Sequence, residues 1–141
     1  MKTFFSLAIV CLISFSGFSQ NENSNVAEFK FDEETIDYGK IVKGSEKIRI
    51  FKFTNVGSAP LIIERIQSSC GCTVPEKPEE PILPGEKGEI KVSYDTNRPG
   101  GFSKMITIFS NAKTSKKIIK IKGYVENVKL LEKEKSMMSN N

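Results

Sequence analysis

The chain has 141 residues, 38% of them hydrophobic, which is enough for the core of one domain of ordinary size. Its net charge of +4 comes from 21 Lys and Arg against 17 Asp and Glu, interspersed along the chain, unlike the basic surface of a nucleic-acid-binding protein. The absence of histidine removes the commonest general base and the commonest metal ligand, and we expect no catalytic residues.

The N-terminal segment is typical of a cleaved secretory signal peptide. Lys2 precedes an apolar run over residues 4–18, and the small residues Gly17 and Ser19 stand just before a polar change at Gln20. The run is shorter than the about 20 apolar residues that a membrane span needs, although an uncleaved anchor is the alternative. We predict a signal peptide over residues 1–19, and an exported protein that is periplasmic, at the cell surface or extracellular, with no membrane attachment after cleavage.

The remaining chain divides into a leader, one domain and a tail. Residues 20–26 are polar and are predicted to be a disordered leader, and residues 127–141 form a charged tail that is disordered or a short helix. The domain over residues 27–126 begins with Phe29 and Phe31, which alternate as on one face of a short strand. Residues 34–41 predict a second strand with a kink at Gly39.

Residues 45–55 give the clearest strand pattern, yet its alternation changes phase. Ile48 and Ile50 share one face, whereas Phe51 and Phe53 lie on the other. A β-bulge near residues 50 and 51 would place all four side chains in the core. A strand buried on both faces is the alternative.

Turn residues separate the strands that follow. Residues 61–67 predict a strand that leads into Cys70-Gly71-Cys72, and the proline-rich residues 75–85 predict an extended loop that ends in a type II turn at Pro84-Gly85. Ile90, Val92 and Tyr94 alternate with polar residues and are predicted to point inward. A turn centred on Pro99-Gly100 precedes two last strands over residues 102–110 and 116–125, of which the last carries lysines expected to protect a sheet edge.

About seven short strands, frequent Gly and Pro turns and no convincing helix predict an all-β fold, a single immunoglobulin-like antiparallel β-sandwich. The tryptophan typical of such domains is absent. Cys70 and Cys72 stand only two positions apart, so they cannot form the usual disulfide between sheets. The prediction therefore rests on the rhythm of the strands.

Several linked motifs follow one another between residues 32 and 125. They are Ile36-Asp37-Tyr38-Gly39-Lys40-Ile41, Phe53-Thr54-Asn55-Val56-Gly57, Pro60-Leu61-Ile62-Ile63, Ser69-Cys70-Gly71-Cys72-Thr73, Pro84-Gly85-Glu86 and Tyr94-Asp95-Thr96. Together they resemble the signature of the bacterial domain of unknown function 1573. The resemblance implies an exported immunoglobulin-like domain, similar in build to the ASPM/SPD/hydin and major-sperm-protein sandwiches and found mostly in Gram-negative bacteria. It implies no established activity.

The Cys70-Gly71-Cys72 motif allows three states. Alternate residues of an extended strand lie about 6.6–6.8 Å apart at Cα, near the upper limit for a disulfide, so a bond needs a bend that Gly71 could permit. Two thiolates could also bind Cu(I), for which thiolate is a preferred ligand. Alternatively, both cysteines are small buried hydrophobic residues.

We therefore expect a non-catalytic module without a cofactor or a nucleic-acid partner. It would contact an envelope or secreted protein by edge-strand pairing or through a loop. The distinctive surface is expected to comprise Ser69, Cys70, Gly71, Cys72, Thr73 and Pro75. The alternative is a thiol-based redox or copper(I)-binding protein that uses Cys70 and Cys72.

Overall fold

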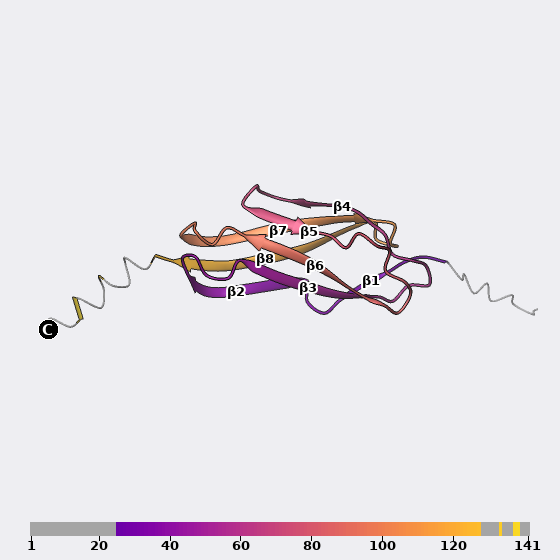
Figure 1. Ribbon diagram of the computed structural model, residues 1–141, viewed down its shortest axis with the longest axis horizontal. Coiled ribbons are helices and arrows are strands. Elements are labelled where there is room, and N and C mark those ends of the chain that lie inside the picture. Colours follow the sequence, from indigo (N-terminus) through magenta and orange to yellow (C-terminus); the bar gives the residue numbers. More distant parts are fainter. Residues whose placement is uncertain (1–24, 128–132, 134–136, 139–141) are drawn as a thin grey trace, which may run out of the picture.

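Eight β-strands build two facing sheets (Figure 1). The computed structural model describes residues 25–127, 133, 137 and 138, so the predicted signal peptide and most of the leader and tail lie outside the described residues. The strands are β1 (Phe29–Phe31), β2 (Thr35–Val42), β3 (Ile48–Asn55), β4 (Ile63–Ser68), β5 (Thr73–Glu76), β6 (Lys87–Tyr94), β7 (Gly100–Ser110) and β8 (Lys116–Glu126). The strand beyond the predicted seven is β5, which contains Pro75 and lies at a sheet edge.

The first sheet has the strand order β1-β3-β6-β5 and the second has the order β2-β8-β7-β4. This arrangement confirms the all-β immunoglobulin-like sandwich. The ladders between the named strands are antiparallel, as predicted, except that between β2 and β8, which is parallel. The chain leaves β2 for the other sheet instead of turning back in a hairpin, and no hairpin therefore fixes the direction of β2 against its neighbour.

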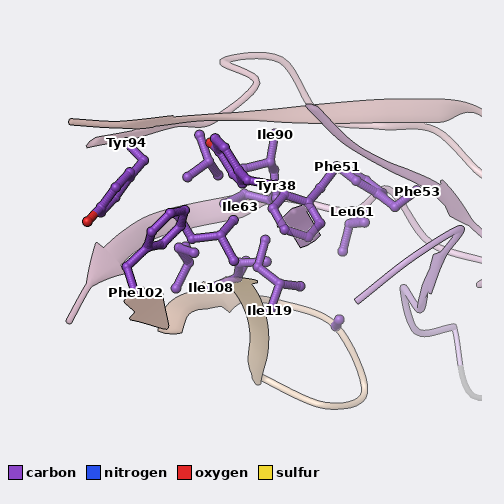
Figure 2. Close-up of a cluster of buried hydrophobic side chains, with 14 of the residues drawn as sticks. Tyr38, Phe51, Phe53, Leu61, Ile63, Ile90, Tyr94, Phe102, Ile108 and Ile119 are labelled. Atoms are coloured by element: carbon purple, nitrogen blue, oxygen red, sulfur yellow. The ribbon is translucent and has the colours of Figure 1, made fainter. Parts of the chain in front are cut away.

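The core fills the space between the two sheets. Figure 2 shows side chains of both sheets pointing into this space, among them Phe51 and Ile90 from the first sheet and Ile108 and Ile119 from the second. These four are at most 1% exposed. Burial of an Ile or Phe side chain contributes about 1.5–3 kcal/mol relative to exposure, so the facing residues of the two sheets hold the sandwich together.

An aromatic cluster closes one part of the core. Tyr94 of β6 stacks on Phe102 of β7 with ring centroids 3.8 Å apart, and Tyr38 of β2 meets Phe102 edge to face at 5.3 Å. The Tyr38 hydroxyl donates a hydrogen bond to the Lys47 carbonyl, 2.9 Å away. Ile90, Val92 and Tyr94 are all buried, which confirms the predicted inward face of β6.

The phase change predicted in β3 has neither of the two expected outcomes. Its pairing with β6 runs without a register shift from Ile48 to Thr54, so no bulge is present. Phe51 and Phe53 are buried, whereas Ile48 and Ile50 remain 43% and 41% exposed on the outer face. Both proposed explanations are therefore wrong, because each assumed that all four side chains had to be buried.

The sequence suggested that the lysines of β8 protect a sheet edge, and this prediction is wrong. β8 lies between β2 and β7 and is therefore an interior strand. Ile119 and Ile121 are buried while Lys122 is exposed on the outer face, where its Nζ lies 3.2 Å from Oδ2 of Asp37. The alternation of buried and exposed residues in β8 was predicted correctly. The position of β8 in the sheet could not be predicted from this local pattern.

Two predicted turn features are confirmed, and a third is displaced. Gly39 has a positive φ of 67° at a register irregularity in β2, and Gly85 has φ 82° in a turn closed by the Glu86 N–H donating to Leu83 O. The turn expected at Pro99-Gly100 instead spans residues 95–98, and Gly100 already begins β7. No helix of the described chain is long and apolar enough to cross a membrane.

Candidate functional site

The Cys70-Gly71-Cys72 segment crosses from the second sheet to the first. It connects β4 with β5, which are edge strands lying side by side (Figure 1). Backbone contacts fix both ends: the Ser69 N–H donates to Met105 O at 3.0 Å, and the Asp95 N–H donates to Cys72 O at 3.0 Å. The segment is thus anchored to β7 on one side and to the loop after β6 on the other.

The structure joins Cys70 and Cys72 in a disulfide, one of the states that the sequence left open. Their Cα atoms are 5.4 Å apart, closer than in an extended strand. A turn brings them together, with the Thr73 N–H donating to Cys70 O at 3.4 Å. Gly71 is not required for this bend, since its φ is not positive and a Cβ there would meet no atom within 4 Å.

Thr73 is not part of the exposed surface predicted from the sequence. It is only 3% exposed, because its side chain points inward beneath the disulfide. Its hydroxyl oxygen lies 3.7 Å from Sγ of Cys70 and 4.0 Å from Sγ of Cys72. A buried hydroxyl is therefore within weak hydrogen-bonding distance of both sulfur atoms.

The disulfide lines an open cleft of about 450 Å³. Val74 and Ser93 line it beside the cysteines, and charged side chains come from Lys47, Asp95 and Arg98. Nothing in the sequence marks Lys47 or Arg98 as a site residue. Two cationic groups and one carboxylate give the cleft a positive balance.

A second loop, over residues 95–98, lines the same cleft. Thr96 is buried, its hydroxyl donates to Ser45 O at 2.8 Å, and its carbonyl accepts from the Gly44 N–H at 3.2 Å. The Asn97 N–H donates to Oδ1 of Asp95 at 3.1 Å. Two separated motifs of the sequence, one around Cys70 and one at residues 94–96, therefore meet at this cleft. Both belong to the set of motifs that resembles the family signature, and this was the only feature of the sequence that linked the two loops.

An apolar patch lies on the outer face of the first sheet beside the cleft. We define it by Ile48, Ile50 and Val74, which are 43%, 41% and 58% exposed. Ser93 pairs with Ile48 on one side and with Val74 on the other, so Ile48 and Val74 flank Ser93 in one row across the sheet, and Ile50 lies in the next row, where it pairs with Lys91. Val74 belongs to both the apolar patch and the cleft lining.

The free edge of β5 is poorly suited to accept a further strand. On β6, the Tyr94 N–H donates toward β3, to Lys47 O, whereas the Asp95 N–H donates toward the β5 side, to Cys72 O. Hydrogen bonding alternates in this way along an antiparallel strand. Backbone groups of Val74, which is paired with residue 93, therefore face β6.

It follows that Thr73 and Pro75 direct their backbone groups to the open edge. The Thr73 N–H is already bonded to Cys70 O, and Pro75 has no N–H to donate. An incoming strand would find carbonyl acceptors but no matching donors from these residues. Proline at an edge discourages strand addition, which leaves side-chain contact as the better use of this surface.

The predicted metal alternative gains no further ligand. In the part of the chain that the structure describes, no group of three or more His, Cys, Asp or Glu residues is placed to hold a metal ion. Glu76, Glu79 and Glu80 of the proline-rich segment are exposed. Copper(I) binding by Cys70 and Cys72 would require reduction of their disulfide.

Comparisons with known proteins give a family and a fold. The family model described as "Protein of unknown function (DUF1573)" matches residues 29–125. The search of curated proteins found no match.

Several solved structures are similar to this chain. A protein of unknown function from Porphyromonas gingivalis aligns over 77% of this chain and 51% of its own, with 17% identity and a TM-score of 0.64. The ASH/PapD-like domain of human CEP192 aligns over 74% and 88%, with 7% identity and a TM-score of 0.57.

The third example is a chaperone and tip adhesion subunit complex of Csu pili from Acinetobacter baumannii. It aligns over 71% of this chain and 58% of the matched chain, with 18% identity and a TM-score of 0.53. The chain thus spans about half the length of the Porphyromonas gingivalis protein, at 51%. At these identities, the likeness establishes the sandwich fold and nothing further.

Proposed function

We propose that this chain, which belongs to the DUF1573 family of proteins of unknown function, is a non-catalytic immunoglobulin-like module that binds another protein in the cell envelope. Its partner would be an envelope or secreted protein. Sandwiches of this build are versatile supports for binding surfaces, and the fold alone does not specify the partner.

Export is supported by the chain's first residues and by its cysteine chemistry. A basic residue, a short apolar run and small residues before Gln20 have the order found in secretory signals. Disulfides persist in oxidising compartments, so the bond between Cys70 and Cys72 suits the periplasm or the cell exterior of a Gram-negative bacterium.

The apolar patch is the observation that carries the proposal. Ile48, Ile50 and Val74 project from a sheet whose inner face already has a complete core, so their exposure does not serve packing within the domain. Exposed apolar side chains that gather on one face among polar residues are a feature of protein interaction sites. We place the partner's apolar side chains against this patch, with its polar groups toward Lys47 and Arg98 in the cleft.

The comparisons support protein binding only by analogy. The Acinetobacter baumannii structure is that of a pre-assembly complex of a chaperone with a tip adhesion subunit. A similar sandwich in that protein therefore occurs in a complex with another polypeptide. For this chain, contact through side chains is favoured over strand addition at β5 because Pro75 leaves that edge without a donor.

Site-specific photo-crosslinking in living cells tests the proposal. A photoreactive residue at Val74 is expected to give a discrete protein adduct, and the same residue at Ile118, which is 47% exposed on the other sheet, gives none. Replacing Ile48 with Lys should remove the Val74 adduct while the domain stays folded. Adducts that are the same from positions 74 and 118, or that persist with I48K, would contradict the proposal.

A further inference from the structure

We propose that the Cys70–Cys72 disulfide is a thiol-exchange site, which accepts an electron pair from a protein dithiol held at the neighbouring apolar patch. The choice of a protein dithiol rests on the proposed function, whereas the reactivity of the disulfide stands on the geometry of the cleft. The disulfide is at the surface of an open cleft, beside the exposed Val74. A bound partner's thiol is thus brought close to the sulfur atoms.

The two sulfur atoms are not equivalent. Cys72 packs against the hydrophobic core, while Cys70 is not among the residues that do so. Both residues are half-buried and line the cleft. We therefore assign attack to Sγ of Cys70, with Cys72 as the leaving sulfur.

The cleft can stabilise the leaving thiolate. Lys47 and Arg98 line the same cleft as the disulfide, so their positive charge favours negative charge on its sulfur atoms and offsets the opposite effect of core packing at Cys72. The Thr73 hydroxyl lies 3.7 Å from Sγ of Cys70 and 4.0 Å from Sγ of Cys72, so it can turn to donate to Cys72 as negative charge develops there. Asp95 is the opposing charge in the lining, so the cationic groups outnumber it.

The exchange balances in two steps. A partner thiolate attacks Sγ of Cys70, which forms a mixed disulfide and breaks the Cys70–Cys72 bond, with the electron pair leaving on Cys72. The partner's second thiolate then attacks the partner's first sulfur, which is bonded to Cys70 in the mixed disulfide, and releases Cys70 as a thiolate. The partner is left with a disulfide, and Cys70 and Cys72 become a dithiol by taking up the two protons that the partner thiols lost. A further molecule that carries a disulfide then oxidises Cys70 and Cys72 again by the reverse exchange.

Reduction leaves the segment's other supports in place. The turn keeps the hydrogen bond from Thr73 N–H to Cys70 O, and the segment keeps that from Asp95 N–H to Cys72 O. Ser68 Oγ also donates to Cys70 O at 2.8 Å. The segment can therefore alternate between oxidised and reduced states without opening the sandwich.

The test follows exchange of the mature protein with glutathione under native conditions, by rapid alkylation and intact mass. We expect reversible reduction of the folded protein, whose circular dichroism stays unchanged. With oxidised glutathione, the C72S variant should form a mixed disulfide at Cys70 about tenfold faster than C70S does at Cys72, since Cys72 packs against the core and is the less accessible residue. Reduction that proceeds only as fast as the domain unfolds in urea, or equal rates for the two variants, would overturn the assignment.

Matched variants test the surrounding groups. The K47Q/R98Q double variant should slow reduction by at least about threefold, whereas the equally charged control K52Q/K87Q should not. Thr73→Val should also slow it, and Thr73→Ser should restore the rate because it keeps the hydroxyl. Unchanged rates in both K47Q/R98Q and T73V would contradict the role of the cleft.

Docking and exchange fail in distinguishable ways. The I48K variant should lose the Val74 crosslink and react with glutathione as the wild type does, while C70S/C72S should keep the crosslink. Crosslinking without glutathione exchange overturns this inference alone. Exchange without any patch-dependent crosslink leaves the site reactive but contradicts the proposed binding function.

Discussion

Gly88 of β6 lies directly beneath the ring of Phe53, its partner on β3. A Cβ at position 88 would overlap the ring, which is also held by Phe29 and Phe31 at centroid distances of 5.1 and 5.3 Å. Gly88→Ala is therefore expected to lower the free energy of unfolding by about 1–3 kcal/mol, the usual cost of overpacking. Urea denaturation measures the change. Gly101→Ala is the control, because its Cβ would find only an ordinary contact at 3.6 Å; equal effects of the two variants would contradict the packing argument.

Asn55 is fully buried and joins several loops through its side chain. Its Oδ1 accepts from the Glu28 and Gly57 N–H groups at 3.3 and 3.0 Å, and its Nδ2 donates to Ala59 O and Ile82 O at 2.8 and 2.9 Å. Asn55→Ala should lower the free energy of unfolding by about 2–4 kcal/mol, because these backbone groups lose their partners. The exposed Asn111 also bonds two backbone groups, and N111A should cost about 1 kcal/mol or less in the same urea measurement.

Asn55→Asp tests the polarity of the same position. It would direct a carboxylate oxygen at the carbonyls of Ala59 and Ile82, which now accept from an amide. Burial and these carbonyls raise the pKa of the introduced carboxyl in the folded state, so the folded protein would bind its proton more tightly. The deficit in unfolding free energy relative to the wild type should therefore shrink as the pH falls from about 7 to about 4. A deficit that is independent of pH would contradict this orientation of the Asn55 amide.

The disulfide should contribute little to overall stability. It joins residues only two positions apart, and cross-linking so short a loop removes little entropy from the unfolded chain. The C70S/C72S variant is expected to lose about 1–2 kcal/mol in urea unfolding and to remain folded. An unfolded variant would show that the bond is required for the fold.

Alkaline pH should destabilise the domain through two buried tyrosines. Burial raises the pKa of Tyr38 and of Tyr94 above the ordinary value of 10.0. The folded state therefore binds these protons more tightly, and the resulting stability is fully present below about pH 10 and lost as the pH rises through the folded pKa values. Urea unfolding between about pH 8 and 11.5 should show this loss.

Phenylalanine variants identify the groups responsible for that loss. Y38F/Y94F is expected to have a flatter pH profile, even though it lacks the Tyr38 hydrogen bond to Lys47 and is less stable at neutral pH. The Y124F control alters an exposed ring and should keep the wild-type slope, because Tyr38 and Tyr94 remain. The same slope in Y38F/Y94F as in the wild type would assign the alkaline loss to other groups.

Local pattern was enough to predict most strands and turns. Alternation in residues 90–94 correctly indicated the buried face of β6, and Pro84-Gly85 correctly indicated a turn with positive φ at the glycine. These features depend on neighbours in sequence, where side-chain period and backbone sterics act directly. Burial of Ile48 and Ile50 was wrongly expected because a hydrophobic side chain does not by itself show which face of its strand will be covered.

For the candidate site, the sequence drew attention to Cys70 and Cys72 and left their state open. It gave no reason to group Lys47 or Arg98 with them, since both resemble ordinary surface cations. Thr73 was expected on the surface but lies beneath the disulfide. Lys47, the disulfide segment and Arg98 come together only because three loops that are separate in the sequence converge in the fold. No local spacing of residues encodes this convergence.

The sequence by itself determined the all-β class, the strand rhythm and the family, because each follows from short-range periodicity and motifs. Only the tertiary structure decided the parallel pairing of β2 with β8, the interior place of β8 and the cleft around Cys70 and Cys72. These depend on which sheet each strand joins. That choice is made by burial and pairing between residues distant in the chain, which the local spacing of side chains does not encode.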